Sequence, residues 1–590
     1  MVRVSLQELQ RVGGLPSIHL KLTPVWSDSN VHQKSQHNGP PTPPAGIAIT
    51  MRLKPPRSRV GAGIPILTLP LKMGPTPSAR YDGNALRAYD SKGELSLSYT
   101  DEDPEFGPRT WFADRDPVGD EIFVEFFAPA RKTDKNTALG PRVDLRRDPG
   151  GGLVGQGIGF IPSPPPPGDT EKGGPGEGTS GSIDPWEITV EWDLDKTPEG
   201  TKGAWSYGDS ISTTVVDSPE RAIGHGVFAL GALQRYPSWD VDLSAAPERV
   251  YAVYWLDPAP WDMISLSKQT NEIYQRIATY FNSLDPFRVF FRQIEYGDGG
   301  TGATYSFVLE YSAPTAPQMT PHEMVDLLAH ETVHEYALME PETEEEAWYV
   351  EGVASYIGAL AGLPRQDMIK SLNNYAQAYY TSPTVGLDYR YVLDHYWDNL
   401  HITRVPYFRG LMYLAQVNGW IIEATVGEHS VDDIIKGLYQ LRLEGKPCGT
   451  KDFNKMLSKY IGEKKTKEAF DAMLRGDLII PGQGCFADYG LKLVRHDLEK
   501  FELGFDPNSM RTSKVKGLVK GSNAEKVGVR EDDEIVIGYQ VWSVADALEN
   551  KMQLTVKRPW GEQTLEWWPR GEKVEAYMWV EAHQESINGL

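Results

Sequence analysis

The chain has 590 residues, enough for roughly three or four domains, and a formal net charge of −22 from 59 basic and 81 acidic residues. So acidic a composition argues against nucleic acid and anionic membranes as partners. No segment has the run of apolar residues that spans a bilayer, and the N-terminus lacks the apolar stretch of a secretory signal. We therefore expect a cytoplasmic protein that does not enter a membrane.

Cys448 and Cys485 are the two cysteines of the chain. So few cysteines favour a reducing compartment and argue against a disulfide framework, although a single pair stays open. The sequence also contains no Cys-x-x-Cys zinc pattern, no P-loop and no Gly-x-Ser-x-Gly elbow. Nucleotide hydrolysis and serine hydrolase chemistry of these common types are therefore not indicated.

Residues 1–247 are predicted to form a β-rich N-terminal domain. Apolar and polar residues alternate from Trp186 to Leu194, and Ile122–Phe127 is a denser apolar run, as expected of strands with a buried face. A stretch rich in proline, glycine and serine, from about 163 to 185, predicts a disordered insertion between strands.

Residues 248–484 are predicted to form a second domain, in which strands precede helices. The spacing of Ile273, Ile277 and Tyr280 predicts a helix. The strand-like runs 289–296 and 304–311 flank a glycine-rich stretch, which we interpret as the loop of a hairpin. Further along, helices are predicted at 407–417 and 430–443.

The glycine-rich stretch has a second interpretation. Glycine lets another backbone approach closely, so four residues of the stretch are candidates for substrate binding: Gly299, Gly300, Thr301 and Gly302. The hairpin and the substrate-binding interpretations are compatible, and we keep both.

The segment from His330 to His334 reads His-Glu-Thr-Val-His and predicts a zinc site. On a helix, residues four apart lie on nearly the same face, so both imidazoles can bind one ion. Glu331 then lies beside the ion, where a carboxylate takes the proton from zinc-bound water. Apolar neighbours predict a buried helix, and Pro341 predicts its end.

Catalytic zinc needs a third protein ligand, and Glu351 is the candidate. A Thr-x-x-Glu capping box at Thr343 and Glu346 predicts the start of a second helix that carries Glu351. Two helices joined by a short loop fold back on each other, which brings Glu351 towards the histidine pair. Other glutamates in and beside the loop are interpreted as a solvated acidic turn: Glu340, Glu342, Glu344, Glu345 and Glu346.

Together, His-Glu-x-x-His and Trp-x-x-Glu-Gly-x-Ala-Ser-Tyr at 348–356 resemble the gluzincin zinc metallopeptidases. The spacer 335–350 is shorter than in the aminopeptidase N type and is more similar to the glycyl aminopeptidase-like family. This resemblance implies a thermolysin-like α/β catalytic domain with a helical half, Zn²⁺ as cofactor and peptides as substrates. It also implies that Tyr407, in Tyr-Phe-Arg-Gly, donates to the oxyanion of the tetrahedral intermediate, with Tyr413 as the alternative.

The same resemblance predicts a glutamate in the glycine-rich stretch that would hold the free amine of a substrate. The stretch has Asp298 instead. Removal of N-terminal residues is the expected activity, and internal cleavage stays open.

Residues 485–590 resemble a PDZ domain. Leu503, Gly504 and Phe505 match the carboxylate-binding loop, and 515–536 matches the run that follows it. The resemblance implies a small β domain that binds the C-terminus of a peptide as an added strand. A PDZ-like fold that only packs on the enzyme is equally consistent with these residues.

The sequence thus predicts a multidomain α+β zinc peptidase with domains at 1–247, 248–484 and 485–590. Two alternatives remain: a catalytically inactive PDZ-bearing protein that binds peptides, and a zinc hydrolase of a non-peptide substrate. The physiological substrate and the oligomeric state are not indicated by the sequence.

Overall fold

A computed structural model of the chain describes residues 14–26, 43–134, 137, 140–166, 184–245, 248–295, 297–339, 344–396, 398–538 and 541–582. Most of the predicted insertion at 163–185, the start of the capping box at Thr343 and the predicted helix stop at Pro341 lie outside these residues. The chain divides into two compact units, Met1–Glu272 with Ser283–Pro317 and Ile273–Asn282 with Gln318–Leu590. The domain boundaries after 247 and 484 stay a prediction.

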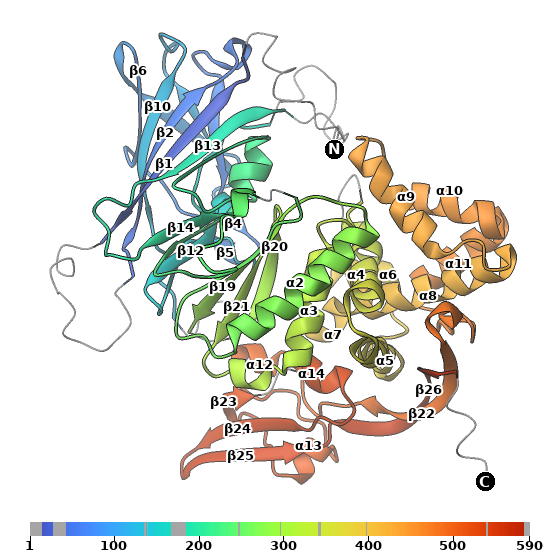
Figure 1. Ribbon diagram of the computed structural model, residues 1–590. Helices are drawn as coiled ribbons and strands as arrows, with labels where there is room; N and C mark the ends of the chain where they lie inside the picture. The colour runs from blue at the N-terminus through green and yellow to red at the C-terminus, as the bar shows by residue number, and fades with distance from the viewer. Residues whose placement is uncertain are drawn as a thin grey trace. The chain divides into compact units, whose positions relative to one another are not determined.

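The N-terminal part of the first unit is β-rich, as predicted. Its largest sheet has seven strands in the order β15-β13-β1-β2-β10-β6-β7 (Figure 1). The predicted strands are found as β13, Trp186–Trp192, with alternating burial, and as β10, Ile122–Pro129. The remaining strands of this sheet are β1 (Ser17–Val25), β2 (Gly46–Lys54), β6 (Leu86–Asp90), β7 (Gly93–Leu95) and β15 (Ser212–Asp217).

Smaller sheets also belong to this part of the unit. Strands β3 (Pro65–Pro70), β9 (Pro108–Ala113) and β8 (Leu97–Asp101) form one of them. Another consists of β11 (Arg146–Asp148), β12 (Gly152–Gln156), β16 (Val227–Gly231) and β14 (Lys202–Trp205). Apolar side chains from several of these strands form one continuous core with those of the seven-stranded sheet.

A five-stranded sheet ends the first unit and corrects one prediction. Its order is β17-β18-β19-β21-β20, with β17 at Gln234–Tyr236 and β18 at Tyr251–Trp255. Strands β19 (Phe287–Ile294) and β21 (Ser306–Ser312) are parallel neighbours, so the predicted hairpin between them is wrong. The glycine-rich stretch is itself a strand, β20 (Gly299–Ala303), antiparallel to β21. Both β19 and β21 are almost wholly buried, which is typical of parallel strands covered on both faces.

The second unit is mainly helical and includes the end of α2, Met263–Tyr280, the helix predicted from Ile273, Ile277 and Tyr280. The predicted helices at 407–417 and 430–443 are found as α8 (Val405–Thr425) and α9 (Val431–Leu443). The histidine helix α3, Pro321–Val333, ends before the predicted stop at Pro341. Before the C-terminal strands, this unit also contains α4 (Ala347–Ile357), α5 (Arg365–Thr381), α6 (Tyr389–Asp394), α7 (Leu400–Thr403), α10 (Thr450–Ile461) and α11 (Glu463–Arg475).

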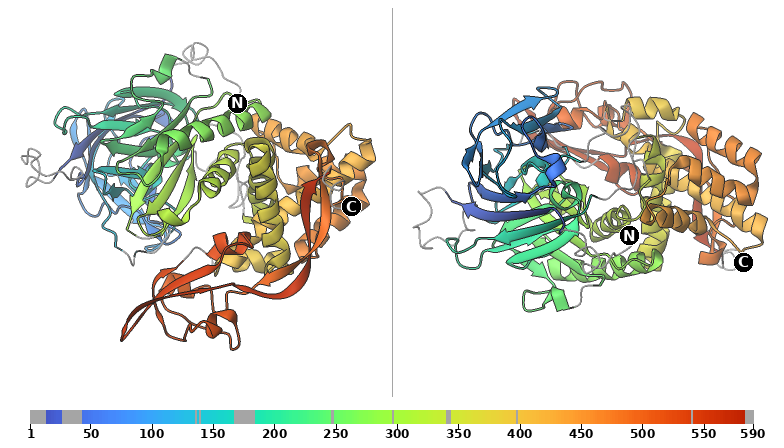
Figure 2. Two further views of the ribbon diagram at one scale, coloured as in Figure 1. Left: turned by 60° about the horizontal axis from the view of Figure 1, so that its bottom comes forward. Right: turned by 90° about the horizontal axis from the view of Figure 1, so that it is seen from above.

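The C-terminal residues of this unit form a small β module. Strand β22 (Leu491–Phe501) pairs with β26 (Arg570–Glu581) in a long antiparallel ribbon that runs along α5 (Figure 2). A second sheet holds β23 (Glu534–Gly538), β24 (Met552–Arg558) and β25 (Gly561–Trp567), and short helices lie at α13 (Asn523–Lys526) and α14 (Val541–Asp546). The module has its own apolar core. Its resemblance to a PDZ domain stays a prediction.

Both cysteines, Cys448 and Cys485, are buried, and neither forms a disulfide. Among the helices that the structure describes, none is both long and apolar enough to cross a membrane.

Candidate metal centre and active site

Helix α3 carries the two histidines of the motif, and its start is defined by its own sequence. The Thr320 hydroxyl accepts a hydrogen bond from the amide of Glu323, whose carboxylate accepts one from the amide of Thr320. His330 lies in the last turn of α3, and His334 caps the helix while still in helical conformation. The two imidazoles are therefore one turn apart, as predicted.

Three ligand atoms converge at the end of α3. His330 Nε2 lies 3.0 Å from His334 Nε2. Glu351 Oε2, from α4, lies 3.2 Å from the Nε2 atom of His330 and 3.4 Å from that of His334. Tetrahedral zinc with ligands at about 2.0–2.1 Å separates them by about 3.4 Å, so this donor set fits zinc in both chemistry and spacing. Within the described part of the chain, no other three such side chains form a comparable cluster.

The protonation of these groups also suits a metal ion. Burial lowers the pKa of His330 to about 4, although its hydrogen bond with Glu351 acts in the opposite direction. His330 is therefore neutral near pH 7 and has a lone pair to offer. Burial raises the pKa of Glu351, but the charge of His334 and the hydrogen bonds of both imidazoles outweigh it, and the pKa lies below its ordinary value. Glu351 is thus ionised and can serve as a ligand.

Ser355 orients one of the imidazoles. Its hydroxyl oxygen lies 3.3 Å from Nδ1 of His330, on the side of the ring opposite Nε2, the candidate ligand atom. Ser355 follows Glu351 by one helical turn, so a single face of α4 contacts both nitrogens of His330. Contacts of this kind set the orientation and tautomer of a metal-binding histidine.

A crossing of two helices brings Glu351 and Tyr407 to the same place. Helices α4 and α8 touch at Gly352 and Gly410, where a Cβ on Gly410 would lie 2.1 Å from the carbonyl oxygen of Trp348. A Cβ on Gly352 would lie 2.7 Å from Cα of Gly410. Gly352 directly follows Glu351, and Gly410 lies about one turn after Tyr407. The close contact therefore explains why both motifs contain glycine.

We predict that Gly410→Ala forces α4 and α8 apart. The added methyl group meets backbone, which cannot rotate away, so stability should fall by about 1–3 kcal/mol. Gly419→Ala is the matched control, because it lies on the same helix and its Cβ would have ordinary contacts at 3.4 Å. The control should keep or raise the melting temperature, since alanine favours a helix. Equal melting temperatures for the two variants would contradict the tight crossing.

Tyr407 lies in the first turn of α8, beside the ligand cluster. Its ring stacks on the imidazole of His330, with centroids 5.3 Å apart and planes 11° apart. Burial and the negative charges of Glu351 and Glu331 raise the pKa of Tyr407 well above its ordinary value, so its hydroxyl stays protonated and can donate. The alternative, Tyr413, is fully buried and packs on Trp348.

Sequence reasoning missed three residues around this centre. Ser355 could have been found from the sequence, because it lies one helical turn after Glu351. Tyr396, which shares a hydrogen bond with Tyr407, precedes it by eleven residues and had no local signal. Arg404 also had none; its guanidinium lies 5.3 Å from the centroid of the Tyr407 ring. Among the glutamates interpreted as an acidic turn, Glu346 accepts hydrogen bonds from Thr450. Glu340 and Glu342 of the same turn lie outside the described residues.

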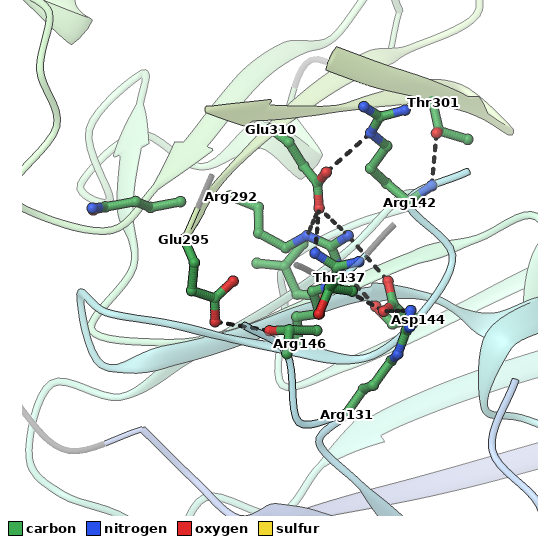
Figure 3. A network of polar contacts seen from close by, with 12 residues as sticks. Arg131, Thr137, Arg142, Asp144, Arg146, Arg292, Glu295, Thr301 and Glu310 are labelled. Carbon is green, nitrogen blue, oxygen red and sulfur yellow. Dashed lines mark hydrogen bonds and ion pairs between the residues drawn. The ribbon is translucent and has the colours of Figure 1, made fainter. Parts of the chain in front are cut away.

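A buried ion network in the first unit holds the glycine-rich strand (Figure 3). Arg292 is fully buried and donates to Glu310 over 2.8 Å through Nε. Arg142 also donates to Glu310, over 3.0 Å, and its guanidinium donates to the backbone carbonyls of Asp298 and Gly300. Asp144 is the second carboxylate of the network, with hydrogen bonds from Arg131, Arg146 and Arg292. The network therefore ties the start of β20 to the rest of its sheet.

The glycines of β20 differ in the space around them. A Cβ on Gly299 would meet the guanidinium of Arg142 at 2.0 Å, and one on Gly300 would meet the Phe307 ring at 1.8 Å. Packing therefore requires glycine at position 300, and a φ of +142° favours glycine at position 299. A Cβ on Gly302 would have open space, so Gly302 is the glycine of the strand that another backbone can approach.

The predicted carboxylate loop of the C-terminal module, Leu503 to Phe505, follows β22. The side chains of Leu503 and Phe505 belong to the module's core. Gly504 has a φ of +92°, and its Cβ would lie 2.8 Å from that of Ala524, so glycine is required there. Among the described residues, no hydrogen bond uses the backbone N–H groups of Leu503, Gly504 and Phe505.

Solved structures are similar to the chain in fold, whereas no family model and no curated protein matches it. An aminopeptidase N family protein from Idiomarina loihiensis is similar over 96% of this chain and 98% of that chain, with a TM-score of 0.58 at 13% identity. An M1 zinc metallopeptidase from Deinococcus radiodurans has a TM-score of 0.48 at 13% identity, over 79% of this chain and 94% of that chain. Yeast LTA4 hydrolase has a TM-score of 0.42 at 13% identity, over 80% of this chain and 68% of that chain. The first likeness shows that the chain shares a multidomain fold along nearly its whole length.

Proposed function

We propose that the protein is a zinc-dependent peptidase that removes N-terminal residues from peptides. The observation that carries the proposal is the cluster of His330, His334 and Glu351, whose ligand atoms have tetrahedral spacing. Glu331 and Tyr407 beside it complete the set of groups that such hydrolysis needs. The fold supports the proposal, since it is that of a protein described as belonging to the aminopeptidase N family.

The residues around the cluster divide the chemistry between them. When bound, the zinc ion acts as a Lewis acid that polarises a carbonyl and makes water more acidic. Glu331 accepts the proton of the attacking water and passes it to the leaving amine. The protonated hydroxyl of Tyr407 donates to the oxygen on which negative charge develops.

We further propose that a substrate binds along β20. This strand is the last of its sheet, so one side of its backbone is not paired with another strand of that sheet. A peptide can add there as a further strand. Gly302 offers the closest approach, while Gly299, Gly300 and Thr301 shape the strand. The amide groups of Leu503, Gly504 and Phe505 are a separate candidate site for the terminal carboxylate of a peptide.

The experiment that tests the function is hydrolysis of a diverse peptide mixture by the purified protein, with and without a zinc chelator, read by mass spectrometry. We expect loss of single N-terminal residues that stops on chelation and returns with added zinc. Internal cuts would make the protein an endopeptidase. Absence of chelator-sensitive products would favour a peptide-binding protein or a non-peptide substrate over the proposal.

We predict that Tyr407→Phe lowers kcat by about 10²- to 10³-fold, the effect of removing one oxyanion donor. KM and bound zinc should stay near their wild-type values, because the ring and the three ligands are unchanged. Tyr413→Phe is the matched control, since it removes a hydroxyl from the same helix in the core. A wild-type kcat for Tyr407→Phe would exclude Tyr407 from the reaction.

A further inference from the structure

The C-terminal module is joined to the helices of the second unit by specific contacts. Leu400 of α7 packs against the apolar core of the module. Asn373 of α5 exchanges two hydrogen bonds with the backbone of Trp579, at 2.8 and 2.9 Å. The amide of Leu548 donates to the side chain of Gln377 over 3.2 Å. These contacts place α14 of the module beside α5 and α7 (Figure 1).

One of these contacts leads to the candidate active site. Asp546, the last residue of α14, forms an ion pair with Arg404, the residue that caps α8. The Arg404 guanidinium lies 5.3 Å from the ring centroid of Tyr407 and 5.9 Å from that of Tyr375. Tyr407 in turn stacks on His330. A continuous series of contacts thus runs from the C-terminal module to a candidate metal ligand.

The charges around Arg404 make Asp546 necessary. Burial disfavours the charged form of Arg404, and the attraction of Asp546 is the largest influence that offsets it. A buried guanidinium that loses its carboxylate is strongly disfavoured and moves towards water. Asp326 of α3 also attracts Arg404. The carboxylate of Asp326, however, accepts a hydrogen bond from the hydroxyl of Ser371. Asp546 is therefore a direct ion-pair partner that helps to keep Arg404 beside Tyr407.

We propose that Asp546 is a positioning residue for the reaction: it holds Arg404 against the ring of Tyr407, so the C-terminal module sets the oxyanion donor in place. This inference rests on the proposed peptidase function. On this basis the module is part of the catalytic apparatus, independently of any peptide that it binds.

The test is a double-mutant cycle on the full-length, zinc-loaded protein. Asp546→Asn should lower kcat by about 10- to 100-fold, the effect of a small misplacement, with KM and zinc content unchanged. In a Tyr407→Phe background the same substitution should have no further effect. Asp546→Glu should restore part of the rate, and Glu549→Gln, an exposed change in the same module, should leave it unchanged. Equal losses in both backgrounds, or none, would overturn the proposal.

Two further measurements separate the proposal from its premises. If Asp546→Asn does not fold, Arg404→Lys, which keeps the charge but loses the planar guanidinium, takes its place in the cycle. If the wild-type protein hydrolyses no peptide, the peptidase function fails and the positioning role fails with it. Hydrogen exchange of 400–413 then still tests the ion pair: faster exchange in Asp546→Asn than in Glu549→Gln supports it, and equal exchange contradicts it.

Discussion

Replacing Glu331 with glutamine should abolish peptide hydrolysis while the protein keeps its zinc. Glutamine has nearly the same shape as glutamate but cannot accept a proton from water at neutral pH. General base catalysis of this kind contributes about 10²- to 10⁴-fold, and Glu331 is expected to transfer protons in two successive steps. We therefore expect a decrease in kcat of at least the order of 10³-fold. Zinc content should remain at one ion per chain, because Glu331 is not one of the three ligands.

The measurement combines steady-state hydrolysis with metal analysis of the same samples. Glu423→Gln is the control, since it makes the same change at an exposed position on α8. Retained turnover in Glu331→Gln would remove Glu331 from the mechanism. Lost zinc would instead show that Glu331 is a ligand, and the assignment of Glu351 would then need revision.

Replacing Glu310 with alanine should lower the free energy of unfolding more than Gly410→Ala does. Glu310 is buried and accepts hydrogen bonds from Arg292 and Arg142, so its removal leaves two guanidinium groups without their main partner. Breaking a buried ion pair in this way typically costs about 3–5 kcal/mol. For a unit of this size, that corresponds to a melting temperature lower by on the order of 10 °C.

Calorimetric unfolding of the zinc-loaded protein checks this expectation. Glu125→Ala is the control, because Glu125 is exposed on β10 of the same unit. A melting temperature for Glu310→Ala within about 2 °C of the control would contradict the role of the network. Because Arg142 joins Glu310 to the backbone of β20, we also expect faster hydrogen exchange in 297–306 of the variant.

The parts of the candidate site that are close in sequence were predictable from the sequence. The spacing of His330 and His334 is a property of one helix, and the Trp-x-x-Glu-Gly pattern indicated Glu351 on the next as the candidate third ligand. Local periodicity also predicted β13, α8 and α9, because a buried face repeats with the period of its own element. These inferences needed no knowledge of which elements pack together.

The tertiary structure decided the features that depend on residues far apart. The glycine-rich stretch is a strand rather than a hairpin loop because β19 and β21 pair in parallel, and parallel pairing has no local signature. The contact of Gly352 with Gly410 and the ion pair of Arg404 with Asp546 each join separate segments. The sequence by itself thus predicted the candidate ligands and the candidate base, because His330, Glu331 and His334 follow from the spacing within one helix and Glu351 from a pattern on the next. Only the fold decided what surrounds Tyr407 and β20, because packing between distant elements depends on shape and burial rather than on any local pattern.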